Sequence, residues 1–311
     1  LITLGAEVTS ISIDDKKRIN AVLDNPKIFK KVDLRNILLC KKYTKNKDIV
    51  INLMGYREST QLGNNQSATA LTSNILCNTN LVMSSCVNNV KNYLICGSIN
   101  QYPPLPVRKE DDVWNGLPKA QDKFVGIAKR LSEIQAEAYS VQYNWHAVKI
   151  VRLANVYGPC DNFNPDTAHV IPALINKSIS NKKQILEVAG DGTAIRDFIY
   201  VDDVVKGILL TLIRGKNNYP YNLGSGKGTS IKNLANVIKK FSNKNIKIKW
   251  NKNMPTGDKK RILNIDRAKK DLQFKTDFNI EKGIQNTIIW YKNNKMIANN
   301  FGRTYAKKYK L

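Results

Sequence analysis

The feature that most constrains the fold of this chain is an alternation of short β-branched runs with long stretches of helical periodicity. The β-branched runs occupy residues 48–54, 90–96 and 147–153, and apolar residues at helical spacing cover 66–87 and 124–142 between them. Helices between strands favour parallel pairing, because each helix returns the chain to the same edge of the sheet. The pattern predicts an α/β fold with a Rossmann-like, doubly wound parallel sheet.

The cofactor end of such a sheet lacks its usual sequence signal. Doubly wound sheets carry a Gly-rich turn after the first strand, where a helix N-terminus meets a pyrophosphate. The chain opens on LITLGAEV, which is typical of a helix end leading into a second strand, here the first predicted strand at 7–13. The segment GSGKGTS at 224–230 is no substitute, because Lys227 is followed by glycine; it is typical of a turn ending at a helix N-cap at Thr229 or Ser230. We therefore expect a sheet without its first strand and Gly-rich loop.

The second half of the chain changes pattern after residue 153. Helices are predicted near 169–180, 202–214 and 230–242, and strands near 184–189 and 245–250. We expect a Rossmann-like cofactor domain and a smaller C-terminal α/β substrate-binding region. The cofactor domain would comprise 1–156 plus 196–222, and the substrate-binding region 157–195 plus 223–311.

Two further stretches carry no helical or strand periodicity. The connection 101–118 contains four of the ten prolines and reads as an ordered loop of the kind that lines sites. The end of the chain, 299–311, is polar and basic and is expected to be a frayed tail.

Composition limits the classes of partner. The chain of 311 residues has 50 Lys and Arg against 25 Asp and Glu, a net charge of +25, but the cations recur along the whole chain instead of forming one patch or arm. We expect no nucleic-acid partner and keep an anionic small substrate as the functional explanation. Five irregularly spaced cysteines give neither a disulfide framework nor a metal site. Without a long apolar run or a signal-peptide layout, the expectation is a cytoplasmic protein with no membrane contact.

Five segments, in order, carry a resemblance to a known family. They are Asp33-Leu34, Asn52-Leu53-Met54-Gly55, CGSINQYP at 96–103, GIAKR at 126–130 and RDFIYVDDV at 196–204. Together they resemble the extended short-chain dehydrogenase/reductases that act on nucleotide sugars, the NAD-dependent epimerase/dehydratase family. The likeness covers nearly all of the chain.

The resemblance implies a cofactor and a set of site residues. It places Ser98 at the catalytic serine, Lys129 at the lysine of a Tyr-x-x-x-Lys dyad and Arg196 at the position that holds the nucleotide phosphates. The cofactor, NADP or NAD, would contact Asp33, Leu34, Leu53, Met54, Gly55, Lys129, Asn155 and Val156. The choice stays open, because Asp14 after the first predicted strand favours NAD whereas Ser12, with basic residues following, favours NADP.

The stretch NVYGPCDNFNPDTAHVIPALINK at 155–177 narrows the resemblance. It is similar to the GDP-L-fucose synthase branch of the family, whose members epimerise and reduce 4-keto-6-deoxy sugar nucleotides with NADPH. That likeness implies His169 as an acid/base of the epimerisation. The substrate contacts that it implies are Asn155, Lys177, Arg196 and Lys260. It also implies a homodimer formed through the two helices predicted at 66–87 and 124–142.

The chain departs from this branch at two positions. Val125 stands where a tyrosine would precede Lys129 by one helical turn, and Asn100 stands where a second epimerisation acid, a cysteine, would be. Cys96 and Cys160 are out of register with that position, and both are expected to be buried thiols. A valine can neither donate nor accept a proton, so we expect little or no reductase turnover. The alternative is a non-catalytic family member that binds a nucleotide sugar or serves as a partner subunit.

Overall fold

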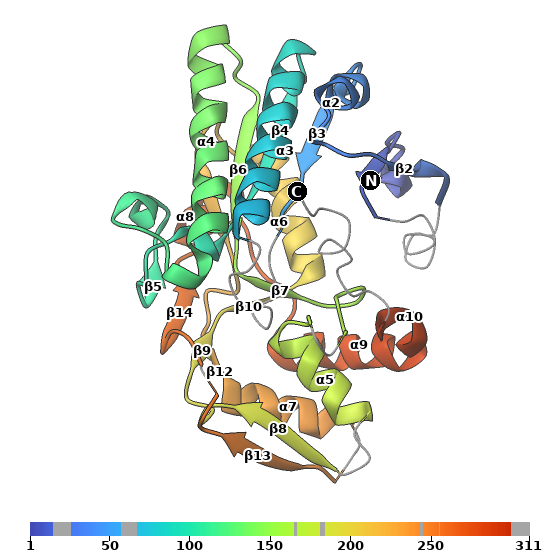
Figure 1. Cartoon of the computed structure of the whole chain (residues 1–311), viewed down its shortest axis with the longest axis vertical. Helices are drawn as coiled ribbons and strands as arrows, with labels where there is room; N and C mark the ends of the chain where they lie inside the picture. Colours follow the sequence, from blue (N-terminus) through green and yellow to red (C-terminus); the bar gives the residue numbers. More distant parts are fainter. Residues whose placement is uncertain are drawn as a thin grey trace.

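The computed structural model describes residues 1–14, 26–56, 67–164, 167–180, 184–242, 245–254 and 256–299. At its centre lies a four-stranded parallel sheet in the order β11-β6-β4-β3. Its strands are β3 (Ile49–Asn52), β4 (Asn92–Ser98), β6 (Val148–Leu153) and β11 (Pro220–Leu223) (Figure 1). The first three lie in or next to the ranges predicted from their β-branched runs, and the predicted parallel pairing is confirmed.

Helices cover both faces of this sheet. Along β4, Tyr93 and Ile95 point into a core shared with α3 (Ser67–Val87) and α4 (Lys123–Tyr143). Leu94 and Cys96 point to the opposite face, into a core that contains Val204 and Ile208 of α6 (Val201–Arg214). This period-two alternation is the physical basis of the doubly wound arrangement. The short helix α2 (Ile37–Thr44) packs on α3.

The N-terminal strands form a separate pair. After the short helix η1 (Ile2–Leu4), β1 (Ser10–Ser12) pairs in parallel with β2 (Phe29–Lys31), which follows the short helix η2 (Pro26–Ile28). Among the described residues no ladder joins β1 to β3. In the strand order 3-2-1-4-5-6 of a doubly wound sheet, the first strand lies between the second and the fourth. The described sheet has no strand at that position.

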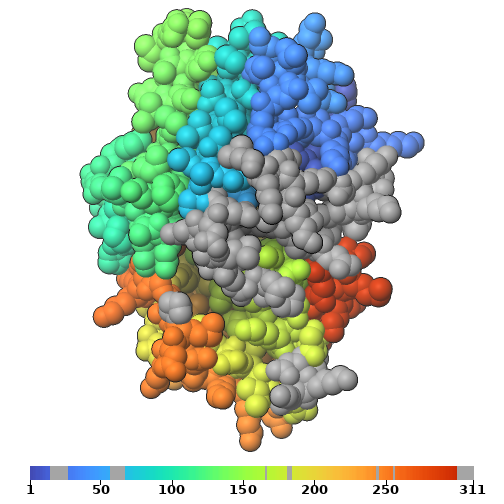
Figure 2. Space-filling view, in the orientation of Figure 1, coloured from blue at the N-terminus to red at the C-terminus, as the bar shows by residue number. Residues whose placement is uncertain are grey.

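The C-terminal region mixes short strands with helices around its own core. Its elements are β7 (Asn155–Tyr157), α5 (Val170–Ser180), β8 (Ile185–Ala189), β9 (Ile195–Arg196), β10 (Phe198–Tyr200), β12 (Thr229–Ser230), α7 (Ile231–Ser242), β13 (Lys247–Asn251), β14 (Lys260–Leu263), α8 (Asp266–Leu272), α9 (Ile280–Asn293) and α10 (Lys295–Asn299). The parallel pair β8-β13 and the helices α5, α7 and α9 enclose one hydrophobic cluster. The elements around this cluster make up the yellow-green to red lower part of the molecule, below the blue-to-green part (Figure 2). The exact domain boundaries stay predictions.

The loop predicted at 101–118 is ordered and only sparsely regular. It contains β5 (Val107–Arg108) and η4 (Glu110–Trp114), and it is flanked by η3 (Ile99–Gln101) and η5 (Ala120–Asp122). The two-residue strand β5 pairs with β14, 155 residues further along, which no local pattern could have predicted. At 224–230 the predicted helix cap is confirmed, because Ser230 Oγ accepts a hydrogen bond from the main-chain nitrogen of Asn233 in α7.

One prediction about the thiols is wrong. Cys96 is buried as expected, but Cys160 is exposed and sits in a left-handed turn with φ of 65°. The Pro-rich sequence around it makes a surface turn, so no core is available to cover the side chain. The predicted tail at 299–311 lies outside the described residues from 300 onward. Within the described part of the chain, none of the helices combines the length and apolarity that crossing a bilayer requires.

Candidate functional site

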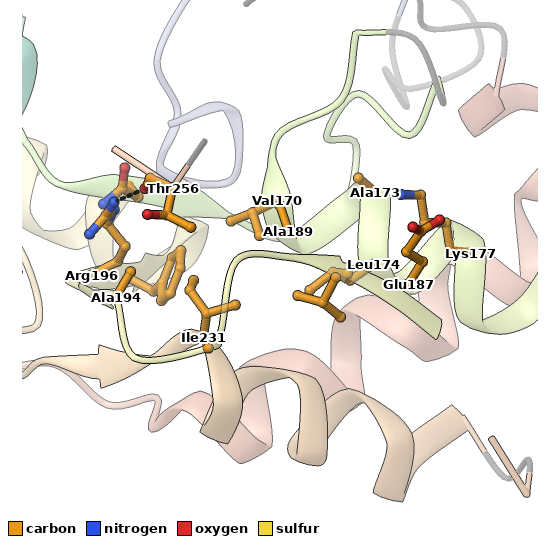
Figure 3. A pocket seen from close by; sticks show the side chains of 14 residues that line it. Val170, Ala173, Leu174, Lys177, Glu187, Ala189, Ala194, Arg196, Ile231 and Thr256 are labelled. Carbon is orange, nitrogen blue, oxygen red and sulfur yellow. Dashed lines mark hydrogen bonds between the residues drawn. The ribbon is translucent and has the colours of Figure 1, made fainter. Parts of the chain in front are cut away.

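A cavity of about 310 Å³ opens between α5 and β8 in the C-terminal region (Figure 3). Its middle is apolar, with Val170 and Leu174 from α5 facing Ala189 and Ile231. Its two ends are polar. Lys177 and Glu187 lie at one end, and Arg196 and Thr256 lie at the other (Figure 3).

A tight turn after β8 shapes the wall of this cavity. Gly190 has φ of 79°, and a Cβ there would lie 2.0 Å from Thr256 Cγ2. Only glycine can combine this left-handed conformation with so close an approach. The turn therefore lets the segment around Thr256 close over the end of the pocket that contains Arg196.

The guanidinium of Arg196 is fixed by main-chain oxygens. Nη1 donates to the carbonyl oxygens of Ile195 at 2.8 Å and Asp258 at 2.6 Å, and Nη2 donates to that of Thr256 at 2.7 Å. Burial lowers the pKa of Arg196, whereas the nearby Asp258 carboxylate raises it. An arginine stays charged at neutral pH even so. Arg196, which the resemblance places at the nucleotide phosphates, is thus one of the residues that line this pocket.

The Asp258 carboxylate lies among several cations. It accepts a hydrogen bond from Lys119 Nζ at 2.8 Å and lies 3.4 Å from Nη2 of Arg108, whose side chain is 2% exposed. Burial acts to raise the pKa of Asp258, but the hydrogen bond and charge of Lys119 and the charges of Arg108 and Arg261 lower it below its ordinary value. Asp258 is therefore an ionised anchor for the segment that holds Arg196.

Ser98 lies at the carboxyl end of β4, in a turn that is fixed on both sides. Its main-chain nitrogen donates to Gln101 Oε1 at 2.6 Å, and its Oγ accepts from the nitrogen of Asn100 at 3.2 Å. Asn100, which is 8% exposed, accepts a hydrogen bond through Oδ1 from Arg261. Asn100 is thus engaged by an arginine of β14 at the position where the resemblance would place an acid.

Lys129 points back from α4 toward the ends of two strands. Its Nζ donates to the carbonyl oxygens of Met54 at 2.5 Å and Cys96 at 2.7 Å. The side chain is buried, and burial lowers the pKa of its ammonium. The third ammonium hydrogen has no acceptor among the described residues, and a Cβ on the exposed Gly55 would lie 3.7 Å from Nζ. One donor is therefore available just beneath the surface at Gly55.

The tyrosine described next to the Ser98 turn, Tyr102, does not replace the missing phenol. Val125, four residues before Lys129 on α4, is half-buried and has no polar atom. The hydroxyl of Tyr102, near Ser98, donates to Asn222 Oδ1 at 2.6 Å and accepts from Arg152 at 3.0 Å. Burial raises the pKa of Tyr102, so this phenol is a structural group instead of a proton donor.

Of the remaining residues implied at the substrate site, two line the pocket and two are not among its lining residues. Asn155 lines it and donates through Nδ2 to the carbonyl oxygen of Asp197 at 2.7 Å, and the exposed Lys177 lines its other end. His169 is exposed directly before α5. Lys260 is exposed on β14, in register with Ile195, and is not among the residues that line the cavity.

Five of the eight residues implied as cofactor contacts follow the carboxyl ends of β2 and β3. Asp33 is bound by the Arg35 side chain, with Nη2 2.7 Å from Oδ2; that hydrogen bond lowers the pKa of Asp33. Leu34 is buried beside it, while Leu53 and Gly55 are exposed and Met54 is half-buried. Val156 is half-buried on β7, in register with Ile199 of β10. Asp33, Leu34, Leu53 and Gly55 therefore lie at the sheet edge where doubly wound folds bind dinucleotides.

These residues fit one half of a nicotinamide dinucleotide. The spare Lys129 hydrogen beneath Gly55 suits a ribose hydroxyl, and the exposed Leu53 suits contact with a flat ring or sugar. The described residues offer no Gly-rich turn for the diphosphate. The fit is therefore limited to the nicotinamide and ribose end.

A parallel sheet with helices on both faces and polar groups at its carboxyl edge defines the class of dinucleotide-binding α/β proteins. Residues 1–224 match the model of the NAD dependent epimerase/dehydratase family. Because the match covers most of the chain, the protein belongs to that family.

Curated relatives and solved structures agree with this assignment. The chain is 27% identical over 236 residues to the probable GDP-L-fucose synthase 1 of Oryza sativa subsp. japonica, covering 73% of this chain and 71% of the relative. It is also 27% identical over 236 residues to the GDP-L-fucose synthase of Escherichia coli (strain K12), covering 71% of this chain and 73% of that one.

Two solved structures show the same fold. A UDP-glucose 4-epimerase of Thermotoga maritima, solved with UDP-glucose, superposes with a TM-score of 0.80 at 22% identity, covering 95% of this chain and 94% of that one. A GDP-L-fucose synthetase of Naegleria fowleri bound to NADP also gives 0.80 at 22% identity, with 91% of each chain covered. The Rossmann-like fold is confirmed.

Several groups at the site carry no signal in the sequence. Thr256, Asp258 and Arg261 lie more than 50 residues beyond Arg196 and belong to no motif, and Glu187 sits in a strand of ordinary composition. Only pairing of β9 with β14 brings Arg261 opposite Arg196. A local motif could not have revealed this arrangement.

Proposed function

We propose that this protein binds a nucleotide sugar in the cavity between α5 and β8 and acts on its sugar as an epimerase with an impaired reductase step. The observation that carries the proposal is the pocket itself, with the fixed Arg196 at one end, Lys177 at the other and an apolar middle. Arginine fits a diphosphate because its planar fork donates two parallel hydrogen bonds. An apolar middle suits the faces of a ribose and a base.

The relatives favour the sugar chemistry. The curated relatives named above are GDP-L-fucose synthases, and the similarity of 155–177 to that branch extends along α5, the helix that lines the pocket. We propose a 4-keto-6-deoxy sugar nucleotide as the substrate, and NADP or NAD as the cofactor.

In the proposed reaction the residues of this chain have separate tasks. His169, exposed at the start of α5, would take a proton from the carbon next to the sugar ketone and leave an enolate. Asn100 stands at the position of the second acid and is no acid, so water would deliver the proton to the opposite face of that carbon. Ser98 Oγ would donate a hydrogen bond to the ketone oxygen, and the spare Lys129 hydrogen would orient the nicotinamide ribose. NADPH, when bound, supplies the hydride of the reduction.

The reduction also needs a proton at the ketone oxygen. A tyrosine phenol performs this in the family, with its pKa lowered by the lysine one turn on. Val125 has no proton to give, and the Tyr102 phenol is engaged with Asn222 and Arg152. This favours the second candidate, a family member that binds the nucleotide sugar without completing turnover.

A homodimer is part of the proposal. Helices α3 and α4 pack side by side on one face of the sheet (Figure 1) and leave large apolar side chains on their outer surface. Examples are Leu76 and Val87 on α3 and Ile134 and Val141 on α4. Pairing these two helices with their copies would bury this surface. The five free thiols fit a reducing compartment, and we propose the cytoplasm.

Binding and chemistry can be tested separately. A thermal-shift series with GDP-, UDP-, CDP- and dTDP-sugars should raise the melting temperature with one nucleotide class only. The 4-keto-6-deoxy sugar nucleotide is then supplied with NADPH in deuterated water. Deuterium uptake beside the ketone without NADPH oxidation would support the impaired reductase, and rapid NADPH oxidation would contradict it. Binding without either reaction would favour the non-catalytic alternative, and no thermal shift with any class would contradict the proposal.

A further inference from the structure

The donors of Arg196 are divided between the protein and the pocket. Both Nη1 hydrogens and one Nη2 hydrogen are given to main-chain oxygens, two of which, those of Thr256 and Asp258, belong to one short segment. Among the described residues no acceptor meets Nε–H or the second Nη2–H. These two hydrogens remain available to a ligand, and the donors of an arginine can bind two oxygens of a phosphate at once.

The segment that accepts these bonds is itself anchored through Asp258. Its carboxylate is 14% exposed and bridges Lys119 and Arg108, both from the long loop after β4. The main-chain oxygen and the side chain of the same residue thus face different partners. The oxygen faces Arg196, and the carboxylate ties the segment to the Rossmann-like part of the molecule.

We propose that Asp258 is a positioning residue that presets Arg196 for a diphosphate, an inference that rests on the proposed function. By anchoring its own carbonyl oxygen, Asp258 holds the guanidinium of Arg196 in place at the end of the cavity that this residue lines. A preset donor pair binds more tightly because little side-chain freedom is lost on binding.

The charges around Asp258 support this role. Arg108, Lys119, Arg196 and Arg261 surround two carboxylates, Asp258 and Asp122. The cluster has an excess of two positive charges, which matches the two negative charges of a nucleotide-sugar diphosphate. Asp258 therefore fixes the cations without cancelling the attraction for the ligand.

The test is whether Asp258→Asn strengthens or weakens the affinity for GDP and UDP, measured by calorimetry. Removing a negative charge beside an anion site would tighten binding if only the Coulomb interaction mattered. Positioning predicts the opposite, a loss of about 10-fold, as expected when one charged hydrogen bond is weakened. Asp277→Asn, which breaks a 2.7 Å ion pair with Lys206 away from the cavity, is the matched control and should leave binding unchanged.

A double-mutant cycle separates positioning from a general structural role. In an Arg196→Ala background, Asp258→Asn should have almost no further effect, because the group it positions is gone. Tighter or unchanged binding by the single variant, or the same loss in both backgrounds, would overturn the inference.

A measurement without ligand tests the positioning of Arg196 separately from the proposed function. The Nε–H of Arg196, assigned by its disappearance in Arg196→Lys, should give a rigid NMR signal in the unliganded protein and a mobile one in Asp258→Asn. Equal mobility in both proteins would overturn the positioning role. Failure of the unmodified protein to bind any of GDP, UDP, CDP and dTDP would overturn the proposed function alone.

Discussion

The carboxylate of Glu133 and the guanidinium of Arg152 form a buried bidentate ion pair, with Nε 3.0 Å from Oε1 and Nη2 2.6 Å from Oε2. Glu133 lies one helical turn after Lys129 on α4, and Arg152 lies on β6. Gln101 extends the pair to the Ser98 turn, since its Nε2 donates to Glu133 at 2.7 Å and its Oε1 accepts from Ser98. The pair therefore couples the helix that carries Lys129 to the turn that carries Ser98.

We predict that Glu133→Gln lowers the free energy of unfolding by about 3–5 kcal/mol, because it leaves Arg152 charged and buried without a counter-ion. The measurement is urea denaturation. Glu281→Gln is the control, since Glu281 pairs with Lys240 at 3.2 Å with both side chains more than half exposed. Glu281→Gln should lower the free energy of unfolding by less than about 1 kcal/mol. Equal losses in the two variants would contradict the prediction.

The sequence predicts the fold correctly where a strand or helix is long enough to show its period of apolar residues. The alternation in β4 and the 21-residue periodicities of α3 and α4 fix the faces of the sheet by burial alone. Strands such as β9, β12 and β14 have two to four residues, too few to show a period. Their pairing depends on contacts made after the larger elements have packed.

The site was predictable only through its motifs. Arg196 and Lys177, which the resemblance names as substrate contacts, line the cavity, whereas Lys260, on β14, is not among its lining residues. The sequence did not indicate Asp258 and Arg261, because these residues reach Arg196 only when β14 and the segment before it pack against β9. Charge on its own does not distinguish them in a sequence with 50 Lys and Arg.

The pKa of Asp258 gives a pH dependence with a definite sign. Burial acts to raise this pKa, but Lys119 and Arg108 lower it below the ordinary value of 3.8. A carboxyl with a lowered pKa in the folded state stabilises the protein above pH 3.8, and this contribution is lost as the pH falls through the folded-state value. We expect Asp258→Asn to lower the melting temperature most at neutral pH, with the difference shrinking below about pH 3.8. A difference that does not change with pH would contradict this.

The thiols should differ sharply in reactivity. Burial raises the pKa of Cys40 to about 11 and that of Cys77 to about 12, and it raises those of Cys86 and Cys96 as well. Cys160 is exposed. An aromatic disulfide reagent at neutral pH should therefore label one thiol per folded chain quickly and all five after denaturation. Cys160→Ser should abolish the fast reaction; a fast reaction that survives would mean that another cysteine is accessible.

The proposed dimer predicts a mass of twice 35.1 kDa by light scattering at micromolar concentration. Ile134 and Val141 of α4 are 45% and 81% exposed in the single chain. Ile134→Glu combined with Val141→Glu should shift the protein to monomer, because four carboxylates would be buried at a two-fold interface. Ile213→Glu on α6, at a residue 78% exposed, is the control and should leave the mass unchanged. A monomeric unmodified protein would contradict the interface.

The last prediction concerns the missing phenol. Val125 and Lys129 are four residues apart on α4 and so share one face of the helix. A tyrosine at 125 would lie near the ammonium of Lys129, which favours the ionised phenolate and lowers the phenol pKa. We expect Val125→Tyr, with the 4-keto-6-deoxy sugar nucleotide and a high concentration of NADPH, to raise NADPH oxidation by about 10²- to 10⁴-fold over the unmodified protein.

Val125→Phe is the matched control, because it adds the ring without the hydroxyl. It should leave NADPH oxidation at the level of the unmodified protein. Deuterium uptake beside the ketone should be similar in all three proteins and disappear in His169→Gln, since it depends on the histidine and not on the phenol. Equal rates for Val125→Tyr and Val125→Phe, in proteins that still bind the sugar nucleotide and NADPH, would show that the proton donor is not the limiting defect. The non-catalytic binding function would then be the better account of this chain.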